Sequence, residues 1–244
     1  MHSKSPAIPD YQLFPLGDAA IVVQLGQTID QEIHKRISAY MAYLAAHTFP
    51  GFSELVPAYT SITIYYDPWV VSEKGQIDPY QKVVEILQQR LAEVPANTKS
   101  TTSEIMEIPV CYGGEFGPDL EIVADHTKLP PEKVITLHAS GNYKVYMIGF
   151  APGFPYLGGL PTKLTAPRKQ TPRTTIPAGS VGIAGRQTGI YPIETPGGWQ
   201  LIGRTPLMLF DPEREKPSLL QAGDTVKFIP ISEEEFARRK ERHP

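Results

Sequence analysis

The sequence lacks the features by which many proteins are assigned to a compartment or a partner. Its single cysteine, Cys111, excludes an intrachain disulfide framework and favours a reducing compartment. No apolar run approaches the roughly 18 residues of a membrane span, and the first residues lack the apolar core of a signal peptide. A net charge of -3 and a pI near 6.1 give no basic footprint for nucleic acid or an anionic membrane. These absences predict a cytoplasmic protein that binds neither nucleic acid nor membrane.

Familiar signatures of catalysis are also missing. The sequence contains no Walker-type phosphate loop, and the glycines of residues 179–185 do not have dinucleotide-binding spacing. No Cys/His group has zinc spacing, so no metal site is expected. Gly-x-Ser-x-Gly is absent, and nothing marks Cys111 as a nucleophile, so the catalytic residue is unknown from the sequence. If the chain takes part in an ATP-driven reaction, the nucleotide site is expected on a partner or between chains.

What the sequence does have is a dense Pro/Gly stretch over residues 149–211. Between these breakers the apolar residues recur in short runs typical of strands, among them Val181, Ile183, Leu201, Ile202, Leu207, Leu209 and Phe210. A disordered tract would lack such runs. The Gly and Pro residues therefore indicate turns in a packed β domain, and the function is expected to lie in this stretch.

The first part of the chain, residues 1–94, is predicted to be an α/β domain. Strands are expected at residues 11–15, 19–25, 54–57 and 61–66. One helix should begin near Asp30 and run toward His47, and a second should begin at Asp78–Pro79, where Asp is a good N-cap and Pro suits the first helical position. This order predicts a small sheet with both helices on one face.

Residues 95–104 are small and polar, as a linker requires, and residues 105–231 form the predicted second domain. It should begin with a strand at residues 105–111, followed by two short helices, with Asp119 as a possible N-cap of the first. A strand is expected at residues 144–149, and residues 223–229 should form a turn followed by a last strand. Ser232 and Glu235 form a capping box for a charged, solvated helix over residues 232–244. The fold class is therefore α+β and mostly β.

Polar side chains among the rigid turns of the second domain are the candidate substrate-binding groups. A guanidinium fork binds a carboxylate bidentately, and a Gln side chain can bind an amide. The candidates are Arg173, Arg186, Gln187, Tyr191, Glu194 and Arg204. The aromatic and proline residues expected to shape the pocket are Phe150, Pro152, Phe154, Tyr156 and Trp199. The alternatives are that the arginines are solvated or pair with the domain's own carboxylates, and that Trp199 fills the core.

The proline content predicts roughly one cis peptide bond. The sequence has 25 prolines, and about 5% of X–Pro bonds in folded proteins are cis. Phe154–Pro155, inside the densest part of the Pro/Gly stretch, is the candidate.

The second part of the chain contains a series of ordered motifs: GFAPGFPYLGGLP at residues 149–161, TPR at 171–173, PAGSVG at 177–182, IYP at 190–192, PGGW at 196–199 and GRT at 203–205. YGGEFGPDL at residues 112–120 precedes them. Together these motifs resemble the KipI family, also called allophanate hydrolase subunit 1 and, more recently, the B subunit of 5-oxoprolinase (PxpB). The resemblance covers essentially the whole chain, weakly before Pro95 and densely after Ile108.

The resemblance implies a ferredoxin-like N-terminal domain followed by a cyclophilin-like β-barrel. It also implies partners: a barrel protein of the KipA type, which is the C subunit of 5-oxoprolinase, and the A subunit of that enzyme. With them the chain would form an ATP-dependent enzyme that opens 5-oxo-L-proline to L-glutamate, and the isolated chain is expected to be inactive. The alternatives are an inhibitor of a sensor histidine kinase and a component of urea or allophanate metabolism. Likeness to cyclophilin in fold does not imply prolyl isomerase activity.

Overall fold

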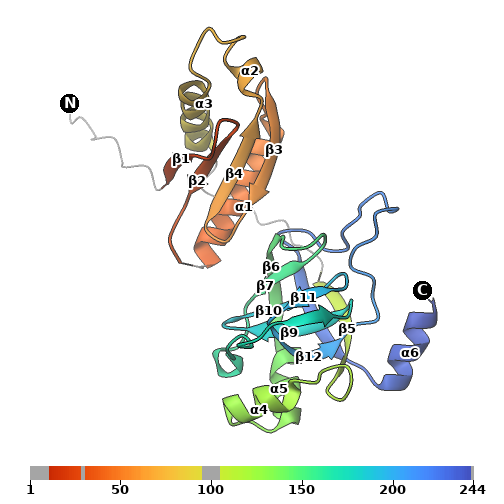
Figure 1. Cartoon of the computed structure of the whole chain (residues 1–244). Helices are drawn as coiled ribbons and strands as arrows, with labels where there is room; N and C mark the ends of the chain where they lie inside the picture. Colours follow the sequence, from red (N-terminus) through yellow and green to blue (C-terminus); the bar gives the residue numbers. More distant parts are fainter. Residues whose placement is uncertain (1–10, 29–30, 95–104, 243–244) are drawn as a thin grey trace. The chain divides into compact units, whose positions relative to one another are not determined.

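The structure is a computed structural model that describes residues 11–28, 31–94 and 105–242 (Figure 1). The chain divides into two compact units, Met1–Thr101 and Thr102–Pro244. The expected linker and the expected N-cap Asp30 lie outside the described residues. The domain limits 1–94 and 105–231 therefore stay predictions.

The first unit is built on an antiparallel sheet in the order β1-β2-β4-β3. The strands are β1 (Gln12–Pro15), β2 (Ala20–Gln24), β3 (Phe52–Pro57) and β4 (Ser61–Tyr66), and the main helices are α1 (Gln31–Ala46) and α3 (Pro79–Glu93). Alternate residues of the two central strands are buried in one core with residues of both helices, namely Ile21, Val23, Ile62, Ile64, Ile37, Leu44, Val83, Leu87 and Leu91. Both helices therefore cover the same face, as predicted.

This arrangement is the expected ferredoxin-like fold with one difference in connection. The run β2-α1-β3-β4-α3 supplies three strands and two helices, and β1, which precedes that run, takes the edge position beside β2 that a strand after α3 would fill. The short helix α2 (Pro68–Val71) was not predicted. It begins on Asp67–Pro68, and the Asp67 carboxylate accepts from the Trp69 amide at 2.9 Å. The same Asp-Pro signal opens α3.

The second unit is a closed barrel in the order β10-β7-β6-β13-β5-β12-β9. Its strands are β5 (Ile105–Tyr112), β6 (Asn142–Ile148), β7 (Pro155–Gly158), β9 (Ser180–Ala184), β10 (Gln187–Ile190), β12 (Gln200–Arg204) and β13 (Thr225–Pro230). A ring of seven strands cannot close with antiparallel pairs alone, and β5 with β13, the first and last strands, form the parallel pair. The cyclophilin-like barrel expectation is confirmed at the level of a closed β-barrel domain.

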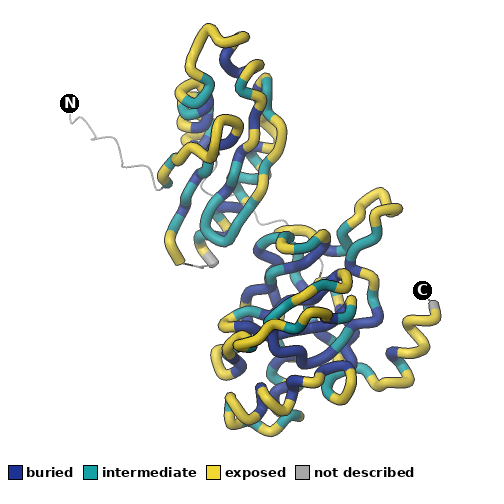
Figure 2. Tube along the Cα trace, viewed as in Figure 1, coloured by how far each residue is buried: buried dark blue, intermediate teal, exposed yellow. Residues whose placement is uncertain are grey.

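Shorter elements cover the barrel. Helices α4 (Leu120–Thr127) and α5 (Pro131–Ser140) pack against β12 and β13. The strands β8 (Arg173–Ile176) and β11 (Thr195–Gly197) form a two-stranded ribbon, and the 3-10 turn η1 spans Thr162–Leu164. Figure 2 shows the contrast between the buried barrel strands and the exposed surface of α6 (Glu233–Arg242).

Three expectations about local structure need correction or comparison. The Phe154–Pro155 bond is trans, so the predicted cis bond is wrong; Phe150 and Gly153, both at positive φ, lie in the turn that precedes β7. Helix α6 is more than a solvated tail, because Phe236 is buried against Cys111 and Phe116. The expected capping bond from the Glu235 amide to Ser232 Oγ is present at 3.2 Å. Among the helices that the structure describes, none combines the length and apolar character that crossing a bilayer requires.

Candidate functional site on the outer face of the barrel

Strand register decides which candidate side chains leave the barrel interior. Val181, Ile183 and Ile202 are fully buried in the interior core. A second cluster lies on the outside of the same strands, beneath the β8–β11 ribbon, and contains Phe154, Ile176, Ala184, Tyr191, Trp199 and Leu201. The outer face of β9 and β12 is therefore the surface on which candidate residues gather.

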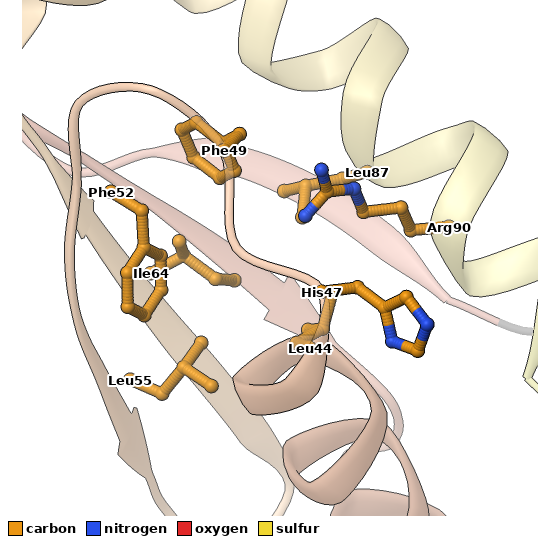
Figure 3. A pocket seen from close by; sticks show the side chains of 8 residues that line it. All are labelled: Leu44, His47, Phe49, Phe52, Leu55, Ile64, Leu87 and Arg90. Atoms are coloured by element: carbon orange, nitrogen blue, oxygen red, sulfur yellow. The ribbon is translucent and has the colours of Figure 1, made fainter.

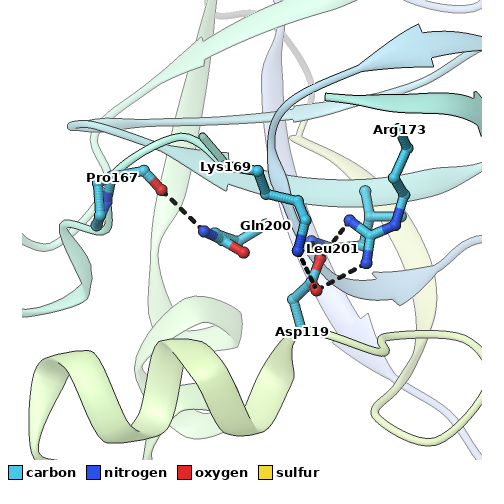
Figure 4. Close-up of polar contacts among 6 residues, drawn as sticks. All are labelled: Asp119, Pro167, Lys169, Arg173, Gln200 and Leu201. Atoms are coloured by element: carbon cyan, nitrogen blue, oxygen red, sulfur yellow. Dashed lines mark hydrogen bonds and ion pairs between the residues drawn. The ribbon is translucent and has the colours of Figure 1, made fainter. Parts of the chain in front are cut away.

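Arg173 is committed to an internal ion cluster at the start of α4 (Figure 4). Its guanidinium donates to both oxygens of Asp119 at 2.7 Å. Lys169 Nζ lies 3.2 Å from Oδ1, and the Leu201 amide donates to Oδ2 at 2.7 Å. Asp119 is 1% exposed. Arg173 therefore pairs with a carboxylate of its own domain, which was the alternative to substrate binding.

The protonation of Asp119 follows from these bonds. Burial alone raises the pKa of a carboxyl group, but the Arg173 hydrogen bonds, the Leu201 amide and Lys169 together lower the pKa of Asp119 below its ordinary value. Asp119 occupies the N-cap position of α4 but makes no side-chain capping bond. The predicted N-cap position is confirmed, but the carboxylate bonds within the ion cluster and does not cap the helix.

Arg204 lies on the same outer face but has a different environment. A β-bulge between Leu201 and Gly203 precedes it, and its register partners are Ser180 on β9 and Cys111 on β5. The guanidinium carbon lies 5.8 Å from the centre of the Phe116 ring. Ser180, which was not among the sequence candidates, is fully buried. No sequence pattern marks it, since a lone Ser in a strand carries no signal of its own.

Tyr191 and the predicted pocket-shaping aromatics form one packed group. Phe154 makes edge contacts with Tyr156, Tyr191 and Trp199 at centroid distances of 4.8, 5.2 and 5.6 Å. Burial raises the pKa of Tyr191 to about 12, so this phenol is neutral near pH 7. Trp199 is 5% exposed and fills a buried cluster, as the alternative to a pocket-shaping role predicted.

Phe150 is the exposed member of the aromatic group. It is 61% exposed and has φ of 70°, a conformation that non-glycine residues rarely adopt. Its ring meets the rings of Phe154 and Tyr191 edge-on, at centroid distances of 5.4 and 6.4 Å. Pro152, the remaining predicted pocket-shaping residue, is exposed in the same turn.

Three further candidates lie elsewhere on the barrel. Arg186 is exposed at the turn between β9 and β10, and Gln187 pairs with Ala184 at that end of the hairpin. Glu194 is exposed in the connection between β10 and β11. Arg204 pairs with Ser180 at the opposite end of β9. The structure thus gathers Arg173, Tyr191 and Arg204 around one face and leaves the others apart.

A buried polar chain crosses the core of the second unit and was missed by sequence reasoning. Thr188 Oγ1 donates to the Gly182 carbonyl at 2.9 Å, so it accepts from His138 Nε2 at 3.0 Å. His138 Nδ1 then accepts from the Tyr112 hydroxyl at 2.8 Å. Burial lowers the pKa of His138 to about 3, which keeps the ring neutral. The hydroxyls of Tyr112 and Thr188 and both ring nitrogens of His138 are hydrogen-bonded, so this buried network has a structural role.

The first unit carries a shallow pocket with no room for a buried water molecule (Figure 3). Apolar side chains line it, with Arg90 and His47 at its edge. Arg90 Nη2 donates to the Thr48 carbonyl at 3.0 Å, and its guanidinium lies 5.6 Å from the Phe49 ring. None of the candidate site residues lines this pocket. Within the described ranges, no group of three or more His, Cys, Asp or Glu side chains could hold a metal ion.

A four-stranded ferredoxin-like unit followed by a closed seven-stranded barrel defines the fold class of this chain. The family model "Carboxyltransferase domain, subdomain C and D" matches residues 11–220. The chain is 52% identical to the B subunit of 5-oxoprolinase from Bacillus subtilis (strain 168), over 95% of this chain and 97% of that protein. It is 43% identical to the B subunit of 5-oxoprolinase from Escherichia coli O157:H7, over 89% of this chain and 95% of that protein. The chain therefore belongs to the carboxyltransferase subdomain C and D family, in the KipI-like group that contains these 5-oxoprolinase B subunits.

A solved structure agrees with this family. The crystal structure of TTHA0988 superposes with a TM-score of 0.75 at 36% identity and covers 87% of this chain. The present chain spans 40% of the length of TTHA0988. The homologous region is therefore found in a longer polypeptide as well as in proteins of this length.

Proposed function

We propose that this chain is the B subunit of an ATP-dependent 5-oxoprolinase, which opens 5-oxo-L-proline to L-glutamate together with subunits of the A and C types. The observation that carries the proposal is the 52% identity to a 5-oxoprolinase B subunit over nearly the full length of both chains. We place the complex in the cytoplasm, in keeping with a single cysteine that is free and buried.

Hydrolysis of an unstrained lactam near neutral pH is unfavourable enough to need coupling to ATP. The sequence of this chain contains no phosphate loop, so ATP binding is assigned to a partner or to a surface shared with one. The role left to this chain is to bind and orient the small acid or its activated form. Rigid donors on β-strands suit that role, because they lose little freedom when the ligand binds.

The substrate-facing surface is proposed to be the outer face of β9 and β12, with Arg204 presented on it and Arg173 holding its edge through Asp119. Tyr191 is buried beneath the ribbon and is proposed to support this surface from below. Arg186, Gln187 and Glu194 remain candidate substrate contacts at other positions of the barrel. Phe150, exposed beside Tyr191, is proposed to contact the substrate or the partner that completes the site.

The test is reconstitution with each subunit omitted in turn. The full chain is co-expressed with its A and C type partners, and ATP hydrolysis is measured with 5-oxo-L-proline or with urea and bicarbonate. The proposal predicts 5-oxoproline-dependent hydrolysis only when this chain is present, and none from this chain alone. Turnover that is unchanged when the chain is omitted would refute it. Activity with urea and bicarbonate instead would assign the chain to urea metabolism.

A further inference from the structure

The β-bulge in β12 is what places Arg204 on the outside of the barrel. Leu201 pairs with Gly182, whereas Gly203 pairs with Val181 and Arg204 with Ser180, so Ile202 is one residue more than β9 can match. Ile202 points into the core, and a Cβ on Gly203 would lie 2.6 Å from Val110 in the same core. The extra residue reverses the order in which successive side chains of β12 point into and out of the barrel. Arg204 therefore points outward, directly beside Ser180.

Two polar atoms of this pair are buried without a partner. Ser180 Oγ and Arg204 Nε make no hydrogen bond within the described chain. The Arg204 guanidinium lies over the ring of Phe116, which offers no carboxylate. By contrast, both terminal nitrogens of Arg173 are bonded to Asp119. Unpaired buried donors cost about 1–3 kcal/mol each and are rare in native proteins. Because neither atom is exposed to solvent, a bound acceptor that removes this cost must displace the groups that cover the pair.

The chemistry of the pair selects the acceptor. One guanidinium supplies a single permanent positive charge with a planar set of N–H donors, and one hydroxyl supplies a further donor. That set complements a carboxylate in charge and in shape. A phosphate dianion would need more positive charge than Arg204 provides. We propose that Arg204 and Ser180 form a subsite for the carboxylate of a small acid, which, resting on the proposed function, is 5-oxo-L-proline.

A pair of ligands tests the subsite on the full-length chain. Binding of 5-oxo-L-proline and of 2-pyrrolidinone, the same lactam without the carboxylate, is measured by isotope-detected NMR titration. The parent chain should bind 5-oxo-L-proline at least about 10-fold more tightly than 2-pyrrolidinone, the value of one charge-assisted hydrogen bond. Equal affinity for the two lactams, or no binding of either, would overturn the subsite.

Two variants separate a binding role from a structural one. Arg204→Lys keeps the charge but removes Nε–H and the planar fork, and should weaken 5-oxo-L-proline binding about 10-fold. Ser180→Ala should weaken it about 5-fold. Because Ser180→Ala removes an unpaired buried hydroxyl, its denaturation midpoint should stay at or above that of the parent. A lower midpoint with unchanged binding would make Ser180 structural and overturn its place in the subsite.

The matched control is Arg36→Lys. Arg36 is also partly buried and lies over an aromatic ring, 6.0 Å from the centre of Tyr40, but belongs to the first unit. It should leave 5-oxo-L-proline binding unchanged. If Arg204→Lys weakens assembly with the partner subunits but not binding of the small acid, the acceptor is a partner's carboxylate and the proposal is wrong. Parent-level KM for 5-oxoproline in an Arg204→Lys complex would overturn the subsite and leave the proposed function standing.

Discussion

Replacing Asp119 by asparagine removes the charge on which the ion cluster beneath the ribbon depends. The carboxylate accepts two Arg173 bonds and the Leu201 amide bond, all at 2.7 Å. Asparagine offers one oxygen and turns its NH2 group toward a cation. Breaking a buried ion pair costs about 3–5 kcal/mol. The Arg173 and Lys169 side chains are 26% and 25% exposed, so the freed cations gain some hydration. The expected loss is therefore about 2–3 kcal/mol.

The two tryptophans allow this loss to be measured in the second unit alone. Trp69 is 63% exposed in the first unit, and Trp199 is buried beside Leu201 in the second. In a Trp69→Phe background, Trp199 fluorescence reports unfolding of the barrel. With a denaturant slope of about 2 kcal/mol per molar urea, Asp119→Asn should lower the midpoint by about 1–1.5 M. Asp125→Asn, an exposed acid on the same helix, should change stability by less than about 0.5 kcal/mol.

The pH dependence supplies the sign of the effect. The pKa of Asp119 is lowered from 3.8 in the folded chain, so its contribution is fully present above pH 3.8 and is lost as the pH falls through the folded pKa. The difference between parent and Asp119→Asn should therefore shrink only below that pH. A midpoint shift smaller than that of Asp125→Asn, or a difference that disappears already near pH 6, would refute this account of the cluster.

Three other changes test the second unit. Tyr112→Phe leaves the buried Nδ1 of His138 without a donor and should lower the unfolding free energy by about 1–3 kcal/mol. In the parent, nitrogen NMR should find the His138 proton on Nε2. A proton on Nδ1 would contradict the hydrogen-bond directions described for Tyr112, His138 and Thr188. Gly117→Ala would press a Cβ into the Ile202 carbonyl group, so a loss of about 3 kcal/mol is expected in urea unfolding; a tolerated alanine would show that this turn is looser. Burial raises the pKa of the Cys111 thiol, which is 3% exposed, so alkylation by iodoacetamide should be about 10-fold slower than for free cysteine, and an equal rate would contradict its burial.

Local patterns were sufficient to predict most elements of the first unit. Asp78–Pro79 opens α3 as expected, and the alternation of β2 and β4 gives the buried face directly. Asp67–Pro68 carries the same signal for α2 and could have been used. Such signals work because caps and alternation depend on residues within one turn or one strand.

The site could not be predicted to the same depth, because its geometry depends on residues far apart in sequence. Arg173 finds its partner 54 residues away, at a position whose local pattern resembles a helix cap. The direction of Arg204 depends on the bulge at Ile202, and no local signal distinguishes a bulged strand from a regular one. Ser180 and His138 are single polar residues in apolar elements, and only the packing shows that one is unpaired and the other fully paired.

The difference between Arg173 and Arg204 indicates how the outer face divides between structure and binding. Arg173 commits its terminal donors to Asp119, and Asp119 in turn fixes the Leu201 amide just before the bulge. The ion cluster thereby holds the segment whose bulge turns Arg204 outward, two residues beyond Ile202. A charge used in this way cannot also bind substrate without loosening the strand. In the proposed subsite the satisfied arginine supports the strand and the unsatisfied one binds the carboxylate. Substitution of Asp119 should therefore weaken carboxylate binding through the position of Arg204.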